Sequence, residues 1–202
     1  MDIQSVRVIR LGPDDWRRFR QIRLLALADA PYAFGSTLAW AQARTDQDWR
    51  DLLAARTQFL ANAGDRDVGT IGAVSETAAA HLISMWVAPE ARGTGVADLL
   101  VRSVVDWATA TGCPGIRLEV SDGNTAAERL YHRHGFRRTG VAGAISPEDP
   151  RLEFEMRLTL LRRDADRVRA GQLTRLPRED PAAPAIPPPT GTLGAGRAAR
   201  LV

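Results

Sequence analysis

"VAPEARGTGVADLLVRSVVDWA", residues 87–108, is the stretch that decides the fold. It is typical of a strand end, a loop rich in arginine and glycine, and a helix over 97–109 with one apolar face. Successive backbone amides at residues 93–97, together with the dipole of the helix N-terminus, form a cradle for an anion. Because glycine lets phosphate oxygens approach the backbone, and Arg92 adds positive charge at the rim, the loop predicts a pyrophosphate site.

Two other phosphate-binding loops compete for this stretch. A mononucleotide P-loop needs a lysine before its serine or threonine, and the sequence contains no lysine. A dinucleotide fingerprint begins at Gly93 and Gly95, but Asp98 occupies its third small position, and residues 88–92 separate the strand from the first glycine. Glu119, at the end of the next strand, could serve as a ribose ligand, so dinucleotide binding stays open as an alternative.

A second motif, "NTAAERLYHRHGF", follows one helix and one strand later, at residues 124–136. It predicts a short helix that Asn124 caps and that ends just before Gly135. Tyr131 lies about two helical turns after Asn124, so both side chains are expected to face the same groove.

The two motifs together resemble those of the GCN5-related N-acetyltransferase (GNAT) superfamily. The family pattern Arg/Gln-x-x-Gly-x-Gly/Ala matches from Arg92 to Ala97, and its second pattern matches from Asn124 to Phe136. The order of elements over residues 5–160 is also similar to that of the family. The chain beyond this range lies outside the resemblance.

The resemblance implies an α/β (α+β) GNAT fold, with a mixed, mostly antiparallel central sheet flanked by helices. Strands 81–87 and 116–121 are expected to splay apart, leaving a V-shaped gap for the pantetheine arm of acetyl-CoA. Acetyl-CoA is the implied co-substrate, and no metal is expected. The residues implied to bind it are Met85, Trp86, Val87, Arg92, Gly93, Thr94, Gly95, Val96, Ala97, Asn124 and Ala127.

Two catalytic roles follow from the resemblance. Tyr131 donates a proton to the departing CoA thiolate, and Glu119 takes a proton from the amine, as in members with a matching "LEV" strand. Alternation along the strand also allows Glu119 to face solvent or pair with neighbours of Arg117. His81 and Ser84 lie on the other bordering strand, and neither is the carboxylate that other members place there. A chain of waters is a further route, so the base stays open.

The acceptor is expected to be a small-molecule amine or a protein N-terminus. Tyr32 and Phe34 lie in a loop over 31–37, where the family's variable substrate loop falls, and are candidates to line the acceptor pocket. Packing between the two flanking helices explains them equally well.

Composition is that of a globular protein, with 45% apolar and 25% charged residues in 202. No apolar run is long enough for a membrane span, the N-terminus lacks the layout of a signal peptide, and one cysteine, Cys113, excludes an internal disulfide. We expect a cytoplasmic, bacterial protein with neither nucleic-acid nor membrane partner; a homodimer stays open.

Two regions are predicted, an N-acetyltransferase domain over 1–161 and a tail over 162–202. The tail carries eight arginines against four acidic residues, so the remainder of the chain is near −1 although the net charge is +3. Six of the twelve prolines fall between 177 and 189. We expect a helical extension over 162–172 and disorder over about 173–202.

The remaining elements are predicted from periodicity. Helices are expected over 16–30 and 45–55, and strands over 5–11, 57–63, 68–76 and 151–160, with a further strand after 135. The function predicted from all these features is acetyl transfer from acetyl-CoA to an amine by direct attack in a ternary complex. The competing class is a GNAT-fold module that binds CoA without turnover.

Overall fold

The computed structural model describes residues 2–146 and 149–160, which lie in one compact unit, Met1–Arg162. Its centre is a seven-stranded sheet in the order β1-β2-β3-β4-β5-β7-β6. Every neighbouring pair is antiparallel except β4 and β5. This confirms the mixed, mostly antiparallel sheet. The strands are β1 (Val6–Leu11), β2 (Thr57–Ala63), β3 (Arg66–Ser75), β4 (Ala80–Val87), β5 (Gly115–Ser121), β6 (Arg137–Ser146) and β7 (Asp149–Thr159).

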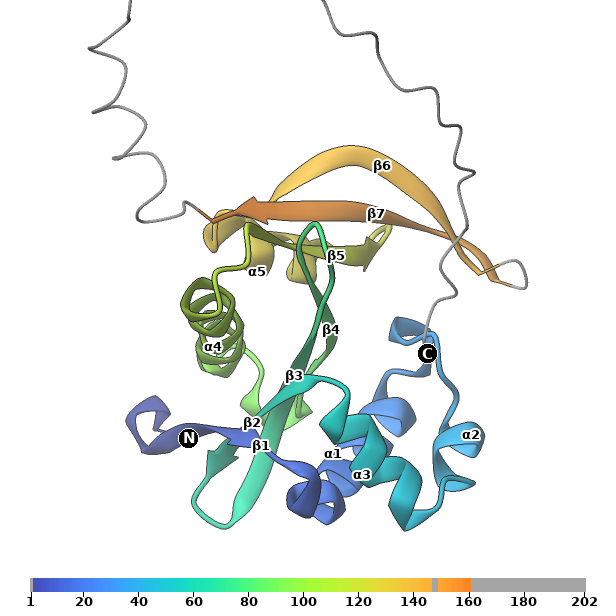
Figure 1. Ribbon diagram of the computed structural model, residues 1–202, viewed down its shortest axis with the longest axis vertical. Coiled ribbons are helices and arrows are strands. Elements are labelled where there is room, and N and C mark those ends of the chain that lie inside the picture. The colour runs from blue at the N-terminus through green and yellow to red at the C-terminus, as the bar shows by residue number, and fades with distance from the viewer. Residues whose placement is uncertain (1, 147–148, 161–202) are drawn as a thin grey trace, which may run out of the picture. The chain divides into compact units, whose positions relative to one another are not determined.

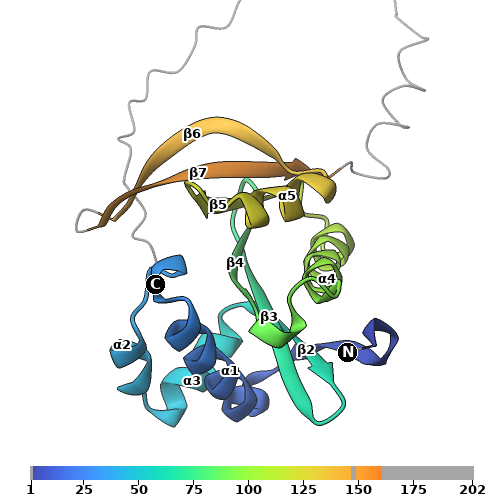
Figure 2. The same ribbon diagram turned by 180° about the vertical axis from the view of Figure 1, so that it is seen from behind.

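Helices cover both faces of the sheet around β3 and β4 (Figures 1 and 2). One face carries α4, and the other carries α1, α2 and α3. The α-helices of the described residues are α1 (Trp16–Asp29), α2 (Leu38–Gln42), α3 (Asp46–Ala54), α4 (Val96–Ala110) and α5 (Thr125–Arg133).

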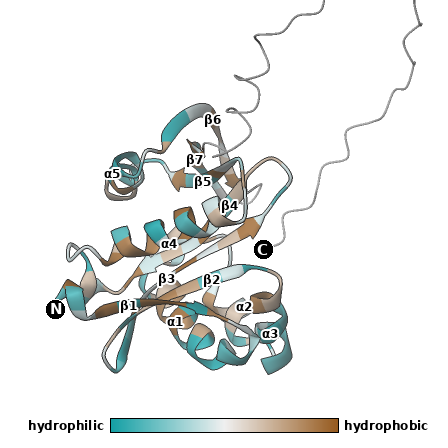
Figure 3. Ribbon diagram, turned by 60° about the vertical axis from the view of Figure 1, so that its left-hand side comes forward, coloured by the Kyte–Doolittle hydropathy of each residue, from teal (hydrophilic) through white to brown (hydrophobic). Residues whose placement is uncertain are grey.

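The α4 helix is held to the sheet by one apolar face. Its buried residues recur at helical spacing, and polar and apolar positions alternate along it in Figure 3. Val96 and Leu100 meet the backbone of β3 at Gly69, where an added Cβ would lie 3.3 and 2.9 Å from their side chains. This close approach fixes the start of α4, and with it the glycine loop, against the middle of the sheet.

A bulge divides β4 into two parts. Thr70 pairs with Trp86 and Gly72 pairs with Ile83, so two residues of β4 oppose one residue of β3. Ser84, within the bulge, has a φ of 56°, in the left-handed region. The bulge re-aims the second half of β4, from which the expected pantetheine contacts come.

The sheet splits where β4 and β5 separate. These strands pair only at Ala80–Ile116 and His81–Arg117, near their starts. Beyond these pairs β4 leads away from β5, as Figure 1 shows. The expected splay is therefore confirmed, and the facing edges of the two strands have backbone groups that do not pair with each other.

The helices and strands predicted within the described residues are present in the structure, which also contains the short α-helix α2. Residues 38–42 form this helix, which was not predicted because five residues are too few to show a helical period. The Thr37 side chain caps it by accepting from the Trp40 amide at 3.2 Å. The expected helical extension and disordered tail lie outside the described residues, and the domain boundary at 161 stays a prediction.

Gly115→Ala is expected to lower the free energy of unfolding by about 1–3 kcal/mol. A Cβ at Gly115 would lie 2.7 Å from the Leu158 carbonyl oxygen, a backbone atom of β7 that cannot turn aside. Gly143→Ala is the matched control, because a Cβ there meets nothing within 4 Å. Urea unfolding of both variants checks the prediction, and equal losses would contradict it.

Candidate active site

The loop between β4 and α4 presents its backbone amides to an open space. Gly93 and Gly95 have φ values of 76° and 95°, and a Cβ added at Gly93 would meet nothing within 4 Å. The Thr94 hydroxyl fixes the turn by donating to the Ala91 carbonyl at 2.7 Å. Within the described ranges, no backbone carbonyl accepts from the amides of residues 93–95. These donors and the first turn of the 15-residue helix α4 are the groups from which the anion cradle was predicted, and its binding of an anion stays a prediction.

Arg92 joins this loop to the end of α1. Its guanidinium pairs with the Asp29 carboxylate and donates through Nε to the Val87 carbonyl at 3.1 Å. Trp86 Nε1 donates to the same carboxylate at 2.9 Å, and this hydrogen bond, followed by that from Arg92, holds the pKa of Asp29 below its usual value. The Trp86 side chain thus connects β4 to the end of α1. A direct contact between Arg92 and a phosphate stays a prediction.

Four ionisable side chains gather where β4 and β5 begin to part. Glu119 Oε2 lies 2.6 Å from His81 Nε2, and its other oxygen accepts from Arg117. Arg117 also forms two hydrogen bonds to Glu76, at 2.9 and 3.0 Å, and lies 3.2 Å from His81 Nδ1. About a quarter of the Glu119 side chain is exposed (24%), so solvent and a substrate can reach it. Glu119 thus pairs with Arg117 while part of its side chain stays exposed, and its role as a base stays a prediction.

The second motif forms α5 as predicted. The Asn124 side chain caps the helix by accepting from the Ala127 amide at 3.1 Å. Tyr131, about two turns later, is buried and packs edge-to-face on Phe136, with ring centroids 5.6 Å apart. Burial raises the pKa of Tyr131 well above its usual value. The phenol therefore keeps its proton at neutral pH.

A cavity of about 550 Å³ lies beside this motif. It is lined by Ala33, Ser121, Asp122, Gly123, Asn124, Arg151 and Leu152. These residues come from the short turn η3 (Pro31–Ala33), the end of β5, the β5–α5 loop and β7, so the cavity borders the predicted acceptor loop. Phe34, which follows η3, lies over the Arg23 guanidinium at 4.4 Å. The side chain of Tyr32 lies outside the described part of the structure, and its role stays a prediction.

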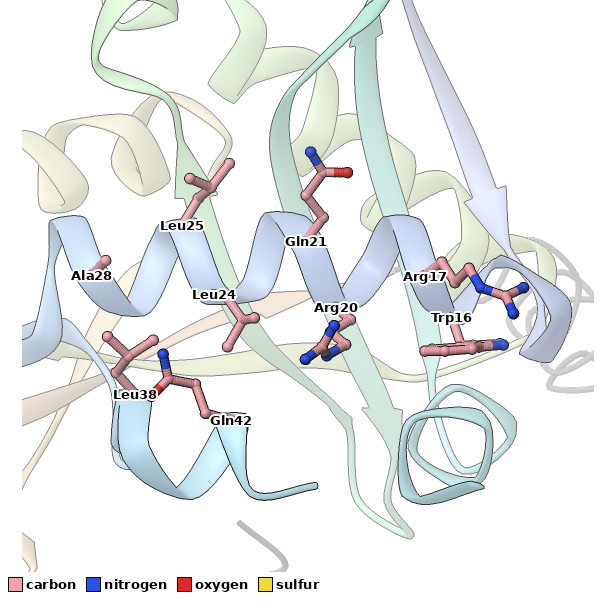
Figure 4. Close-up of a pocket in the computed structure, with 9 residues that line it drawn as sticks. All are labelled: Trp16, Arg17, Arg20, Gln21, Leu24, Leu25, Ala28, Leu38 and Gln42. Carbon is pink, nitrogen blue, oxygen red and sulfur yellow. The ribbon is translucent and has the colours of Figure 1, made fainter. Parts of the chain in front are cut away.

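A second cavity, of about 590 Å³, lies on the outer side of α1 (Figure 4). Figure 4 labels its lining residues, Trp16, Arg17, Arg20, Gln21, Leu24, Leu25, Ala28, Leu38 and Gln42. None of them belongs to the glycine loop, the charged cluster or the second motif. We therefore place the candidate site at the gap between β4 and β5 and not at this cavity.

The three histidines pair with carboxylates. His81 lies beside Glu119, His132 lies 3.4 Å from Glu128, and His134 lies 2.9 Å from Asp98. Within residues 2–146 and 149–160, no group of three or more His, Cys, Asp or Glu could hold a metal ion. No helix in the described part of the chain is long and apolar enough to cross a membrane.

Asp98 connects the first turn of α4 to the end of α5. It accepts from Arg133 Nε at 2.7 Å and contacts His134, and the Arg133 hydrogen bond is the main reason that its pKa falls to about 2. A carboxyl whose pKa is depressed in the folded state contributes stability above its unfolded pKa, near 4, and loses it as pH falls toward about 2.

Asp98→Asn is accordingly expected to lower the free energy of unfolding by about 1–2 kcal/mol at pH 7, after allowance for the exposed Arg133. The difference from the parent protein should shrink between about pH 4 and pH 2. Asp106→Asn, on the exposed side of α4, is the control. Urea unfolding across pH checks this expectation, and a loss that persists unchanged to the lowest pH would contradict it.

Comparison with known proteins matches the sequence to one family. The family model described as "Acetyltransferase (GNAT) family" matches residues 19–136, more than half of the chain. N-acetyltransferase 8B of Rattus norvegicus is 34% identical over 88 residues, which cover 41% of this chain and 40% of that protein. The chain spans about half or less of the length of the curated relatives it matches.

Solved structures share the fold. An acetyltransferase of the GNAT family from Streptococcus pneumoniae superposes with a TM-score of 0.67 at 17% identity, covering 77% of this chain and 99% of that one. The PaiA N-acetyltransferase of Thermoplasma acidophilum, solved in complex with coenzyme A, gives a TM-score of 0.61 at 15% identity, covering 77% and 99%.

Proposed function

Because the chain belongs to the acetyltransferase (GNAT) family, we propose that it transfers an acetyl group from acetyl-CoA to an amine, by direct attack in a ternary complex. The observation that carries the proposal is the coincidence of two features. The β4–β5 pairing stops after His81, and the loop that contains Gly93 and Gly95 follows the end of β4 at Val87. Acetyl-CoA is a long, thin thioester with a negatively charged pyrophosphate, so it suits a gap between β4 and β5 that leads to this glycine loop.

The amides of residues 93–97 and the α4 N-terminus are placed to bind the pyrophosphate. The pantetheine arm lies along the edge of β4 at Met85, Trp86 and Val87, adding to the sheet as an extra strand would. Asn124 and Ala127 contact it from the start of α5. Gly93 supports this placement of the pyrophosphate. A Cβ at Gly93 would extend into the open space beside the loop, and glycine leaves that space to the ligand.

The amine must lose a proton before it attacks, because an ammonium has no free electron pair. Glu119 accepts this proton in the proposed mechanism. His81 and Arg117 are positioning residues, since each contacts one of the two carboxylate oxygens. The amine nitrogen then attacks the thioester carbon to form a tetrahedral intermediate, and the nitrogen gives its second proton to solvent. When the intermediate collapses, the carbon–sulfur bond breaks with its electron pair leaving on sulfur.

Tyr131 assists departure of the thiolate. Burial keeps its proton in place at neutral pH, so its hydroxyl can donate a hydrogen bond to the sulfur as negative charge develops there. A phenol with a raised pKa is a weaker acid than a thiol. Stabilisation by the hydrogen bond is therefore the larger part of its role, and solvent completes protonation of the released thiol.

Two alternatives are less well supported. A CoA-binding module without turnover would not require both a buried tyrosine and a positioned carboxylate at the same gap. Dinucleotide binding suits a doubly wound parallel sheet whose first glycine follows the strand directly. Here only β4 and β5 are parallel, and the turn η4 (Pro89–Ala91) separates β4 from Gly93.

Thermal unfolding of the protein alone, with acetyl-CoA and with NADH tests the proposed ligand. A ligand at 100 times its Kd adds about 2.7 kcal/mol to the free energy of unfolding. We expect stabilisation by acetyl-CoA and none by NADH. Stabilisation by NADH, or by neither compound, would contradict acetyl-CoA as the co-substrate.

A further inference from the structure

Three arginines gather between α1, α2, α3 and the start of β2. Arg23 lies on α1, Arg44 follows α2, and Arg56 stands just before β2. Each guanidinium lies over an aromatic ring, with the central carbon 3.9 to 4.6 Å from the ring centroid. The rings are Phe34 for Arg23, Trp40 for Arg44 and Phe19 for Arg56. We call these three residues the arginine cluster.

Several donors of the arginine cluster are buried without an acceptor. Among the described residues, none accepts from these buried atoms, which are Arg23 Nη1, Arg44 Nε, Arg56 Nε and Arg56 Nη2. The Trp49 Nε1 donor, in the ring beside Arg44, is also buried without an acceptor among the described residues. The Ser36 hydroxyl accepts from Arg23 Nη2 at 2.7 Å, which satisfies one other donor of the arginine cluster.

No carboxylate in the described ranges forms an ion pair with the arginine cluster. Asp48 feels the charge of Arg44, but its carboxylate is exposed and bonded to Thr45. Burial and then the charges of its two neighbours lower the pKa of Arg56 to about 9, and burial and then Arg44 lower that of Arg23 to about 10. Both side chains remain cationic at neutral pH. Buried, mutually repelling cations without a counter-charge are costly to the fold, so a bound anion would compensate them.

The arginine cluster lies on the same face of the sheet as the proposed base. Thr57 pairs with Ala73, so Arg56 stands next to Val74, and Val74 pairs with His81. Residues directly opposite one another share a face, and two strand spacings place the Arg56 and His81 backbones about 10 Å apart. His81 is in contact with Glu119. The backbones of Arg56 and of His81, the residue in contact with Glu119, are thus separated by about the length of a small molecule.

The acceptor loop connects the two places. Ala33 lines the cavity beside α5, and Phe34, the next residue, lies over Arg23. Gln58, two residues after Arg56, is fully buried, and its Oε1 has no donor among the described residues. Polar groups without partners therefore continue from the arginine cluster along β2, on the side that faces α1.

We propose that the arginine cluster binds a carboxylate of the acceptor, so that the substrate is an amino carboxylate whose amine reaches Glu119. Guanidinium groups bind carboxylates in planar, two-point geometry, which suits three arginines stacked on rings. The proposal rests on the proposed acetyl transfer. The carboxylate belongs to a free amino acid or to an acidic residue near a peptide N-terminus, and the experiment distinguishes these sources.

The first measurement compares kcat/KM for acetylation of ω-amino carboxylates with that for alkylamines of the same length. We expect a preference for the carboxylate of at least about 100-fold, the range of one lost charge-assisted contact. The preference should fall below about tenfold in Arg56→Met and persist in Arg17→Met. Arg17 is the matched control, since it is exposed and stacks on Trp16 at 4.6 Å outside the cluster. Equal use of both substrates by the parent protein would overturn the proposal.

Two further substrates distinguish the sources of the anion. A short peptide that begins with aspartate, preferred over the free amino carboxylate, would assign the carboxylate to a peptide; the reverse preference would assign it to a free amino acid. Either result supports the proposal. An aminoalkyl phosphate preferred over both would overturn the assignment to a carboxylate.

A second measurement does not depend on turnover. Arg56→Met is expected to raise the midpoint of thermal unfolding without ligands, because it replaces an uncompensated buried cation by an apolar chain of similar length. Succinate, used as a carboxylate probe, should raise the midpoint of the parent protein and of Arg17→Met but not that of Arg56→Met. Absence of any succinate effect on the parent protein would overturn the anion site. Succinate binding without acetylation of any amine would instead contradict the proposed function and leave the anion site standing.

Discussion

Glu119→Gln is expected to lower kcat/KM for amine acetylation about 10²- to 10⁴-fold at neutral pH, the usual contribution of a positioned general base. The substitution keeps the size of the side chain and a carbonyl oxygen facing Arg117, but it removes the negative charge that accepts the proton. His81 and Arg117 retain their places, so the loss measures proton acceptance more than structure. Initial rates of CoA thiol release at varied amine concentration give the ratio.

The pH dependence separates this role from a structural one. An alkylamine with a pKa near that of lysine, about 10.4, becomes its own nucleophile as pH rises, so the deficit of Glu119→Gln should shrink toward high pH. Asp51→Asn removes an exposed carboxylate on α3 and serves as the control. A deficit of the same size at every pH would contradict the role of Glu119 as the base.

Tyr131→Phe is expected to lower kcat by about 10- to 100-fold, or about 1.4–2.8 kcal/mol of transition-state stabilisation. The variant keeps the ring that packs on Phe136 and removes only the hydroxyl, so the affinity for acetyl-CoA should be largely intact. Thermal unfolding with acetyl-CoA measures the affinity separately from turnover.

A conservative control accompanies this variant. Phe136→Leu disturbs the same edge-to-face contact from the other side but leaves the hydroxyl in place. It should affect the midpoint of unfolding more than kcat. If Tyr131→Phe instead lost acetyl-CoA affinity while keeping turnover, the proposed contact with the departing sulfur would be wrong.

Periodicity was enough to predict most of the fold, because the relevant patterns are local. The apolar face of α4 and the β2–β3 hairpin depend on residues close together in sequence. The bulge at Ser84 could not be predicted, since a serine in a strand gives no sign of a left-handed φ. The splay of β4 and β5 followed only from the family resemblance, as strand pairing is a long-range property.

The candidate site divides in the same way. The glycine turn at Gly93 and Gly95 before α4 was predictable because the glycines and the start of the helix are adjacent in the chain. The pairing of Arg92 with Asp29 was not, since 63 residues separate them. The arginine cluster has a visible signal, arginines interleaved with aromatic residues over 16–56, but the sequence does not show that no acid meets them.

Amine-dependent release of CoA, measured together with the mass of the acceptor, tests the central claim most directly. With the purified protein, acetyl-CoA and a set of amino carboxylates, the account predicts that one acetylated amine forms for each CoA released. It also predicts that release without an amine stays near the rate of uncatalysed hydrolysis. Binding of acetyl-CoA with no acetylated product from any amine would contradict acetyl transfer and identify the chain as a CoA-binding module.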